Sequence, residues 1–118
     1  MSDSTNPPLT RAEALTELTA PGQPFELEEV DLFGSQCRAF RNAPPTLRDL
    51  FEQNRSDATF FVYDDERYTY DEMYNAAARV AAMLTERYGV VKGDRIAISM
   101  RNYPEWVMTF AAATSIGA

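Results

Sequence analysis

The last predicted helix, over about residues 104–116, sets the tightest constraint on how this chain folds. Apolar side chains lie around its full circumference: Trp106, Val107, Met108, Phe110, Ala111, Ala112 and Ile116. A helix that is apolar on all sides belongs inside a larger structure. Burying each large side chain is worth about 1.5–3 kcal/mol, so leaving several in water would cost many kcal/mol. The sequence then stops at Gly117-Ala118, where a strand–helix unit is expected to deliver its next parallel strand. We therefore expect the chain to be an incomplete piece of a larger protein.

The composition excludes several classes of protein. The 118 residues are 45% hydrophobic and 12% aromatic, which is enough for one small core and argues against wholesale disorder. The absence of histidine removes Ser/His/Asp and Cys/His catalysis and all histidine-ligated metal sites. A net charge of −7 argues against a nucleic-acid partner, because phosphate neutralisation needs clustered Lys and Arg.

The sequence also predicts a cellular location. No run approaches the roughly 20 apolar residues that a membrane span needs, and no basic amphipathic helix supports docking on a membrane. Met1-Ser2-Asp3-Ser4 lacks the basic-then-apolar pattern of a signal peptide. The single cysteine, Cys37, makes no internal disulfide and is typical of a small half-buried side chain in a reducing compartment. We expect a cytoplasmic protein without a transmembrane segment.

Acidic residues gather at the start of the chain. The first 40 positions hold two arginines and seven acids, a balance of −5, whereas residues 41–118 carry a balance of −2. We expect residues 1–9 to form a disordered tail and residues 10–45 to form an acidic leader with a helix and a β-hairpin. Thr10-Arg11-Ala12-Glu13 is a capping box that starts this helix, and Gly34-Ser35 predicts the hairpin turn.

Residues 46–118 predict the start of an α/β domain. Thr46 caps a short helix, and two strands follow over 58–63 and 67–69, with the turn at Asp64-Asp65-Glu66 between them. Thr69-Tyr70-Asp71-Glu72 is a second capping box. It opens a long helix that ends at Gly89 and has one apolar stripe: Tyr70, Met73, Tyr74, Ala77, Val80, Ala81, Leu84 and Tyr88.

The segment after the long helix predicts a buried strand. Residues 95–100 carry apolar or small side chains on both faces, which is typical of a parallel sheet covered on both sides. Pro104 suits the first position of the next helix, because its missing N–H is not needed there.

Four short motifs occur in a characteristic order: Tyr68-Thr69-Tyr70 before an alanine-rich helix, Gly89-Val90-Val91-Lys92-Gly93-Asp94-Arg95-Ile96-Ala97, Asn102-Tyr103-Pro104-Glu105 and Ile116-Gly117-Ala118. Each is common alone, whereas their order and spacing are specific. From Thr46 to Ala118 the chain resembles the start of the adenylate-forming (AMP-binding) enzymes, which include acyl-CoA synthetases, luciferases and peptide-synthetase adenylation domains. The stretch Asn42-Ala43-Pro44-Pro45-Thr46-Leu47 is similar to leaders of the fatty acyl-CoA ligase branch.

The resemblance implies a two-step reaction in the parent enzyme. A carboxylate attacks the α-phosphate of Mg·ATP and releases pyrophosphate, and coenzyme A then displaces AMP from the acyl-adenylate to form a thioester. ATP, magnesium and coenzyme A are therefore implied for the parent. The family's phosphate loop, aromatic-Gly-Glu segment, ribose-binding Asp and catalytic Lys lie downstream. We expect no catalytic, cofactor-binding or metal-binding residue within 1–118, an inactive chain on its own, and the remainder of the parent enzyme as its partner.

Acidic and aromatic side chains were weighed as site candidates. Three adjacent acids, Asp64-Asp65-Glu66, suggest a metal site but are more typical of a solvated turn. Asp71 and Glu72 resemble an acid–base pair, yet the first turn of a helix explains them. The tyrosines are candidates for an acyl pocket, although helical spacing favours core or helix-flanking positions: Tyr68, Tyr70, Tyr74 and Tyr88.

Cationic and glycine residues give weaker candidates. Lys92, the single lysine, sits in a predicted turn, which does not suit a buried activated amine. Gly89, Gly93 and Gly117 do not make a phosphate-cradling motif. Arg101-Asn102 follow the predicted buried strand, where α/β sheets tend to place ligands.

Two other functions fit the same residues. A stand-alone interaction module would cover residues 104–116 by self-association or by swapping that helix between copies. Alternatively, the adenylating chemistry is kept and the substrate or acceptor changes, as in an aryl-CoA ligase, a luciferase-like enzyme or a carrier-protein adenylation domain.

Overall fold

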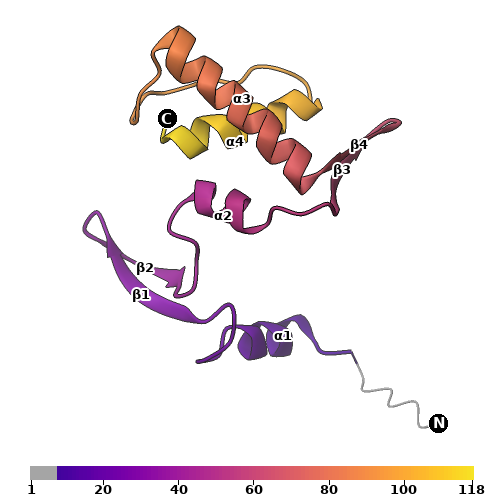
Figure 1. The fold of residues 1–118 in the computed structure, drawn as a ribbon. Coiled ribbons are helices and arrows are strands. Elements are labelled where there is room, and N and C mark those ends of the chain that lie inside the picture. The colour runs from indigo at the N-terminus through magenta and orange to yellow at the C-terminus, as the bar shows by residue number, and fades with distance from the viewer. Residues whose placement is uncertain (1–7) are drawn as a thin grey trace, which may run out of the picture. The chain divides into compact units, whose positions relative to one another are not determined.

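The computed structural model describes residues 8–118 and has a mixed α/β architecture (Figure 1). In the described residues, four helices accompany two antiparallel hairpins, which confirms the predicted class. The chain divides into two compact units, Met1–Ala43 and Pro44–Ala118, which we call unit 1 and unit 2. The predicted tail over 1–9 falls mainly on residues 1–7, which lie outside the described part.

Unit 1 begins with a short helix, α1 (Arg11–Leu18). The predicted capping box is confirmed, because the Glu13 N–H donates to Thr10 Oγ1 at 3.3 Å and the Thr10 N–H donates to Glu13 Oε2 at 2.8 Å. No side chain of α1 is buried, and Leu15 and Leu18 stay exposed. Hydrogen bonds at its ends, rather than the burial of apolar side chains, stabilise this helix.

The hairpin of unit 1 joins β1 (Leu27–Leu32) to β2 (Ser35–Phe40). The turn lies at Phe33-Gly34, one residue earlier than the predicted Gly34-Ser35. Both turn residues have positive φ, 55° and 84°, which defines the two-residue type I′ turn that matches strand twist. Asp31 Oδ1 accepts the Gly34 N–H at 2.9 Å and fixes the turn there, so Ser35 already pairs with Leu32.

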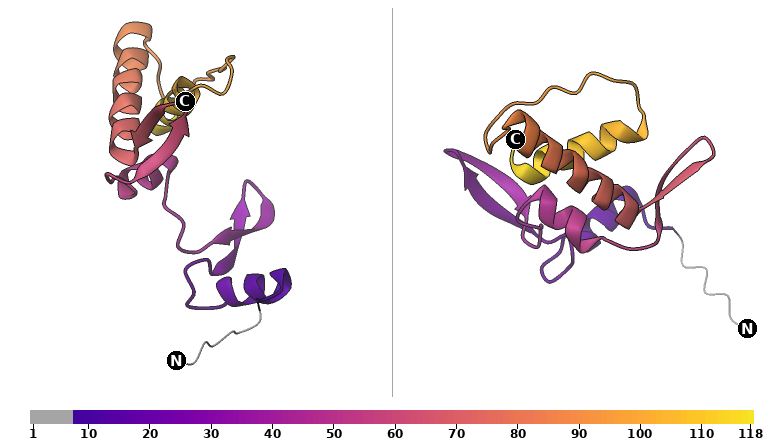
Figure 2. Two further views of the ribbon diagram at one scale, coloured as in Figure 1. Left: turned by 90° about the vertical axis from the view of Figure 1, so that its right-hand side faces the viewer. Right: turned by 45° about the horizontal axis from the view of Figure 1, so that its top comes forward.

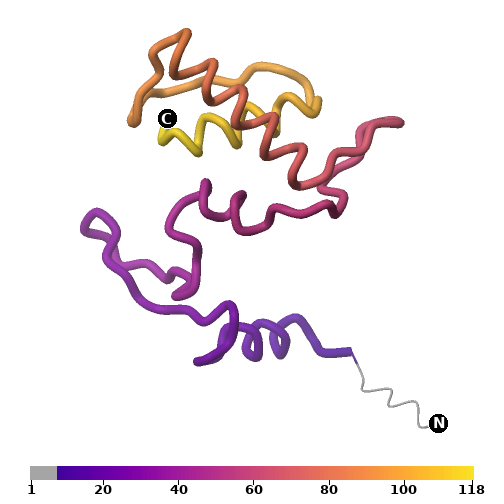
Figure 3. Tube along the Cα trace, viewed as in Figure 1, coloured from indigo at the N-terminus to yellow at the C-terminus, as the bar shows by residue number. Residues whose placement is uncertain are grey.

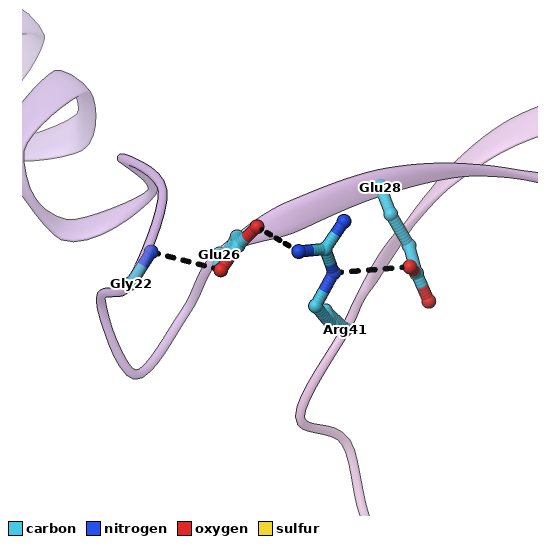
Figure 4. A network of polar contacts seen from close by, with 4 residues as sticks. All are labelled: Gly22, Glu26, Glu28 and Arg41. Atoms are coloured by element: carbon cyan, nitrogen blue, oxygen red, sulfur yellow. Dashed lines mark hydrogen bonds and ion pairs between the residues drawn. The ribbon is translucent and has the colours of Figure 1, made fainter.

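A polar network fixes the turn after α1 to the hairpin (Figure 4). Glu26 is only 9% exposed, and its Oε2 accepts the Gly22 N–H at 2.8 Å while its Oε1 lies 2.5 Å from Arg41 Nη1. Arg41 Nε also donates to Glu28 Oε2 at 3.2 Å. A buried carboxylate is tolerated when it is paired and hydrogen-bonded, so these bonds stabilise the chain path into β1 and out of β2.

Unit 2 begins with α2 (Leu47–Gln53), which is capped by Thr46 as predicted. The Asp49 N–H donates to Thr46 Oγ1 at 3.2 Å. Phe51 packs on the core of the unit, whereas Leu47 and Leu50 remain exposed. The predicted apolar face of this helix is therefore only partly buried.

The second hairpin joins β3 (Thr59–Tyr63) to β4 (Glu66–Thr69). An irregularity in the register between Thr59 and Phe61 leaves Phe60 unpaired, so Phe60 and Phe61 both pack on the core. Strict alternation predicts Phe60 and Val62 on one face, and this is wrong. The bulge shifts the period by one residue and leaves Val62 exposed.

The core of unit 2 lies where α3 (Tyr70–Tyr88) crosses α4 (Pro104–Ile116) (Figures 1 and 2). Its buried members are Met73, Ala77, Ala111 and Ala112. Three small alanines let the two helix backbones approach closely. The predicted stripe is confirmed around Met73 and Ala77 but wrong at Tyr88, which is 64% exposed. Tyr88 is the last residue before Gly89, where a positive φ of 66° ends the helix and turns the chain away.

Residues 95–100 do not form the predicted strand. In the part of the chain that the structure describes, both sheets are two-stranded hairpins, and neither offers this segment a partner. A strand needs a neighbour to satisfy its N–H and C=O groups. Only Ile96 and Ile98 are half-buried, and the trace runs from α3 to α4 as an irregular segment (Figure 3).

Helix α4 carries apolar side chains on more than one face, as predicted. Ala111, Ala112 and Ala113 are buried, while Trp106 and Phe110 are each 36% exposed. These two rings stack with centroids 5.5 Å apart and an interplanar angle of 8°. Among residues 8–118, no helix combines the length and the apolar content needed to cross a membrane.

Candidate functional site

The region where the β3–β4 hairpin meets the start of α4 holds two adjoining hollows. The first has a volume of about 320 Å³ and is lined by Phe61, Val62, Tyr63, Asn102, Tyr103, Pro104, Trp106 and Val107. The second has a volume of about 440 Å³ and is lined by Tyr63, Glu66, Met100, Tyr103, Pro104 and Glu105. We call the second the tyrosine–glutamate hollow. Aromatic rings and carboxylates therefore meet at this surface of unit 2.

Two tyrosines separate the hollows. The rings of Tyr63 and Tyr103 lie 5.6 Å apart at 80°, one edge toward the other's face. Pro104 is buried at the first position of α4, as the sequence predicts. Partial burial raises the pKa of Tyr63, and the nearby phenol of Tyr103 and the carboxylates of Asp64 and Glu105 act in the same direction. The local field is therefore negative.

Tyr68 adds a second phenol beside the same carboxylates. Its hydroxyl donates a short hydrogen bond to Glu66 Oε2, and this bond is the main cause that raises the pKa of Tyr68. The Tyr68 ring stacks on Phe61 with centroids 4.8 Å apart. The hairpin thus holds a phenol–carboxylate pair next to the hollow.

We expect the phenol of Tyr68 to ionise above its ordinary value of 10.0 in the folded chain. Because its folded-state pKa is raised, the stabilisation by this bond is present below pH 10.0 and is lost as the pH rises through the folded-state pKa. Absorbance titration of tyrosinate measures this, with Tyr68→Phe identifying the signal. Glu66→Gln should lower this pKa, whereas Glu29→Gln should leave it unchanged. An equal response to both substitutions would contradict the role of Glu66.

The acidic candidates lie in structural positions. Asp64 and Asp65 form the exposed β3–β4 turn, with Asp64 at a φ of 49°, and Glu66 begins β4. Asp71 Oδ1 pairs with Arg55 Nε at 2.8 Å, and Glu72 Oε2 accepts the Thr69 N–H at 2.9 Å. Within residues 8–118, no group of three or more His, Cys, Asp or Glu side chains is placed to hold a metal ion.

The other tyrosine candidates lie apart from one another. Tyr70 packs edge-on against Phe60, with centroids 4.7 Å apart. Tyr74 lies under the Arg55 guanidinium at 4.6 Å and lines a separate groove of about 180 Å³ between α2, α3 and α4. Only Tyr68 reaches the hairpin surface, so the structure does not gather these four residues into one pocket.

The remaining candidates divide between the hollows and the surface. Asn102 lines the first hollow, whereas Arg101 is exposed and lines neither. Lys92 is exposed in a turn, and its Cγ lies against Gly117, where an added Cβ would meet it at 2.9 Å. Cys37 is half-buried, as predicted, and its thiol donates to the Ser35 carbonyl at 3.4 Å.

Sequence reasoning missed the hollows themselves. Tyr63 was predicted only as a strand residue and Glu105 only as part of a motif before the last helix. The Tyr103-Pro104-Glu105 motif signals a helix start, but nothing local in it shows that the helix begins beside the hairpin. The one available signal was the position of Tyr63 at the end of β3. Side chains alternate between the faces of a strand, so Tyr63 lies on the face opposite to that of exposed Val62.

Comparison with known proteins decides the family. The model of a family described as AMP-binding enzyme matches residues 48–118, which is more than half of the chain. The chain belongs to the AMP-binding enzymes. This confirms the resemblance at the level of the family.

Two relatives of this AMP-binding chain carry the same name. An acetyl-coenzyme A synthetase from Mesorhizobium japonicum is 43% identical over 76 residues, covering 59% of this chain and 12% of the relative. A synthetase of the same name from Pyrobaculum aerophilum is 39% identical over 62 residues, covering 52% of this chain and 9% of the relative. The chain thus spans a small part of the length of the curated relatives it matches. No solved structure matches it.

The two hollows beside α4 carry no cation for the phosphates of a nucleotide. Binding of ATP phosphates needs converging cations and backbone N–H groups. Arg55 is paired with Asp71, Arg41 is paired with Glu26, and Lys92 packs on Gly117. The hollows beside α4 are lined by no Lys or Arg. We therefore route no step of adenylation through residues of this chain.

Proposed function

We propose that this chain forms part of the N-terminal domain of an ATP-dependent acyl-CoA ligase. The family match over residues 48–118 carries the proposal, and relatives named acetyl-coenzyme A synthetase support it. ATP, magnesium and coenzyme A would serve the parent enzyme, which would form an acyl-adenylate and then a thioester. The role of this chain is architectural: α3 and α4 form a packed layer that leaves Trp106, Phe110 and residues 95–99 for the rest of the enzyme to cover.

Two observations bear on the acyl substrate, and they favour acyl chains of different length. The names of the relatives favour acetate. The similarity of residues 42–47 to leaders of the fatty acyl-CoA ligase branch favours a fatty acid. The fatty acyl substrate and the cytoplasmic location stay predictions.

The test begins with the coding sequence beyond Ala118. It should encode a Ser/Thr/Gly-rich phosphate loop, and the whole polypeptide should catalyse carboxylate-dependent exchange of pyrophosphate into ATP. Acetate and a long-chain fatty acid, assayed side by side, separate the two substrate predictions. The 118-residue chain alone is the matched control and should show no exchange, because the hollows beside α4 offer no cation to the phosphates of ATP. A whole polypeptide without the loop and without exchange would overturn the proposal.

One observation favours a second function, that of a self-associating interaction module. Trp106 and Phe110 stack on the exposed side of α4, and stacked aromatic rings often anchor protein interfaces. In this case residues 104–116 would pair or exchange between copies. Light scattering should then show a concentration-dependent dimer that Trp106→Lys weakens. A strictly monomeric chain at high concentration would contradict the module, and a native stop codon after Ala118 would favour it.

A further inference from the structure

The tyrosine–glutamate hollow combines aromatic, aliphatic and acidic side chains in its lining. Its volume is about 440 Å³, and its apolar surface comes from Tyr63, Tyr103, Pro104 and Met100. Pro104 is buried and forms its inner part, whereas Met100 and Tyr103 remain exposed at its mouth. The hairpin and the start of α4 lie on the same side of unit 2 in Figure 1. The hollow therefore joins two elements that are separate in sequence.

The two tyrosine rings form walls nearly at a right angle. Their interplanar angle is 80° and their centroids are 5.6 Å apart. The face of a tyrosine ring attracts a cation placed within about 6 Å of its centroid. An aromatic corner of this kind offers a cation more ring surface than one ring alone.

The charge of the hollow is negative and unbalanced. Glu66 and Glu105 line it, and no Lys or Arg does. In the described residues, the ion pairs join Arg41 to Glu26 and Glu28, and Arg55 to Asp71, so both glutamates of the hollow lack a cationic partner. Partial burial is the main cause that raises the pKa of Tyr63, and the carboxylates of Asp64, Glu105 and Glu66 raise it further. The hollow is thus complementary to a cation with apolar faces.

We propose that the tyrosine–glutamate hollow binds an arginine side chain carried by a partner polypeptide. A guanidinium group is planar, stacks on aromatic rings, is weakly hydrated and donates several hydrogen bonds to carboxylates. A lysine ammonium lacks the planar face, an anion is repelled by Glu66 and Glu105, and an uncharged side chain leaves both carboxylates without a cationic partner. Arg67 and Arg101, which follow Glu66 and Met100 in the sequence, do not line the hollow.

Binding of matched tripeptides to the 118-residue chain tests the proposal. The probes are capped Gly-Arg-Gly, Gly-Lys-Gly and Gly-citrulline-Gly, in which citrulline keeps the shape of arginine without its charge. Trp106 is the only tryptophan of the chain and adjoins Tyr103 in the neighbouring hollow, so its fluorescence reports binding, and amide chemical shifts locate it. We expect saturable binding of the arginine peptide, about five-fold tighter than that of the citrulline peptide, and weaker as salt rises.

Single substitutions distinguish binding in the hollow from general attraction to the negative charge of the chain. Glu105→Gln should weaken binding of the arginine peptide about five-fold. Glu86→Gln makes the same change at an exposed position near the C-terminal end of α3, which is the end away from the β3–β4 hairpin. This substitution should leave binding unchanged. Tyr103→Phe should retain binding and Tyr103→Leu should lose it, with circular dichroism confirming that each variant is folded.

Several results would overturn the proposal: no saturable binding, equal binding of the citrulline or the lysine peptide, or equal effects of Glu105→Gln and Glu86→Gln. The assay contains no ATP, carboxylate or coenzyme A. Failure of arginine binding therefore leaves the proposed ligase function standing, and failure of pyrophosphate exchange leaves the arginine site standing.

Discussion

Met73→Ala is expected to remove a large share of the stability of unit 2. Met73 is 1% exposed and fills the space between α3 and α4 beside Ala77, Ala111 and Ala112. Truncating a buried methionine costs about 2–5 kcal/mol, because the transfer free energy is lost and a cavity remains. A unit of this size has a total free energy of unfolding on the order of 4–11 kcal/mol. Urea unfolding followed by circular dichroism and by Trp106 fluorescence measures the loss.

The same helix provides the control. Met83 is 44% exposed, so Met83→Ala makes the same change without opening a cavity. Its effect should stay within about 0.5 kcal/mol. If the two variants lost equal stability, the result would contradict the conclusion that Met73 stabilises the packing of α3 on α4.

Elements that depend on local signals could be predicted from the sequence. The capping box of Thr69 and Glu72 starts α3, and Gly89 ends it in the left-handed conformation that glycine adopts without strain. The box of Thr10 and Glu13 likewise starts α1. In each case the donor and acceptor lie three residues apart, so the sequence contains both partners of the interaction.

Elements that depend on distant partners could not be predicted in the same way. The apolar pattern of residues 95–100 fits a buried strand, but pairing requires a second strand, and the described residues provide none. The bulge at Phe60 is decided by how the hairpin meets the core, which strict alternation ignores. The side chain of Asp31 accepts the Gly34 N–H and thereby places the turn at Phe33-Gly34 rather than at the neighbouring Gly34-Ser35.

The same distinction applies to the candidate site. Arg101 and Asn102 are weak ligand candidates from their place after residues 95–100; Asn102 lines the first hollow, whereas Arg101 lines neither. Tyr63 and Glu105 are 42 positions apart in the numbering, and only the packing of the hairpin beside α4 brings them together. Aromatic and acidic residues of this kind occur throughout the leader as well, so composition alone does not single them out.

Ala112→Asp is expected to have the largest effect of any substitution in α4. Ala112 is 0% exposed and belongs to the cluster in which α4 meets α3. A carboxylate placed there would lose hydration among the apolar side chains of the cluster, which includes Met73 and Ala77. The expected loss exceeds about 4 kcal/mol, which approaches the total stability of the unit. Circular dichroism and amide dispersion in NMR spectra should show a largely unfolded unit 2.

Two control variants separate charge, volume and helix propensity. Ala78→Asp places the same residue on an exposed position of α3 and should cost about 0.7 kcal/mol, the difference in helix propensity. Ala112→Asn keeps the size of aspartate without its charge and should fall between the two. A folded Ala112→Asp chain would mean that this face of α4 is open to water. In that case α4 would not pack on α3 through Ala112, and the α3–α4 layer could not serve as the foundation of a larger domain.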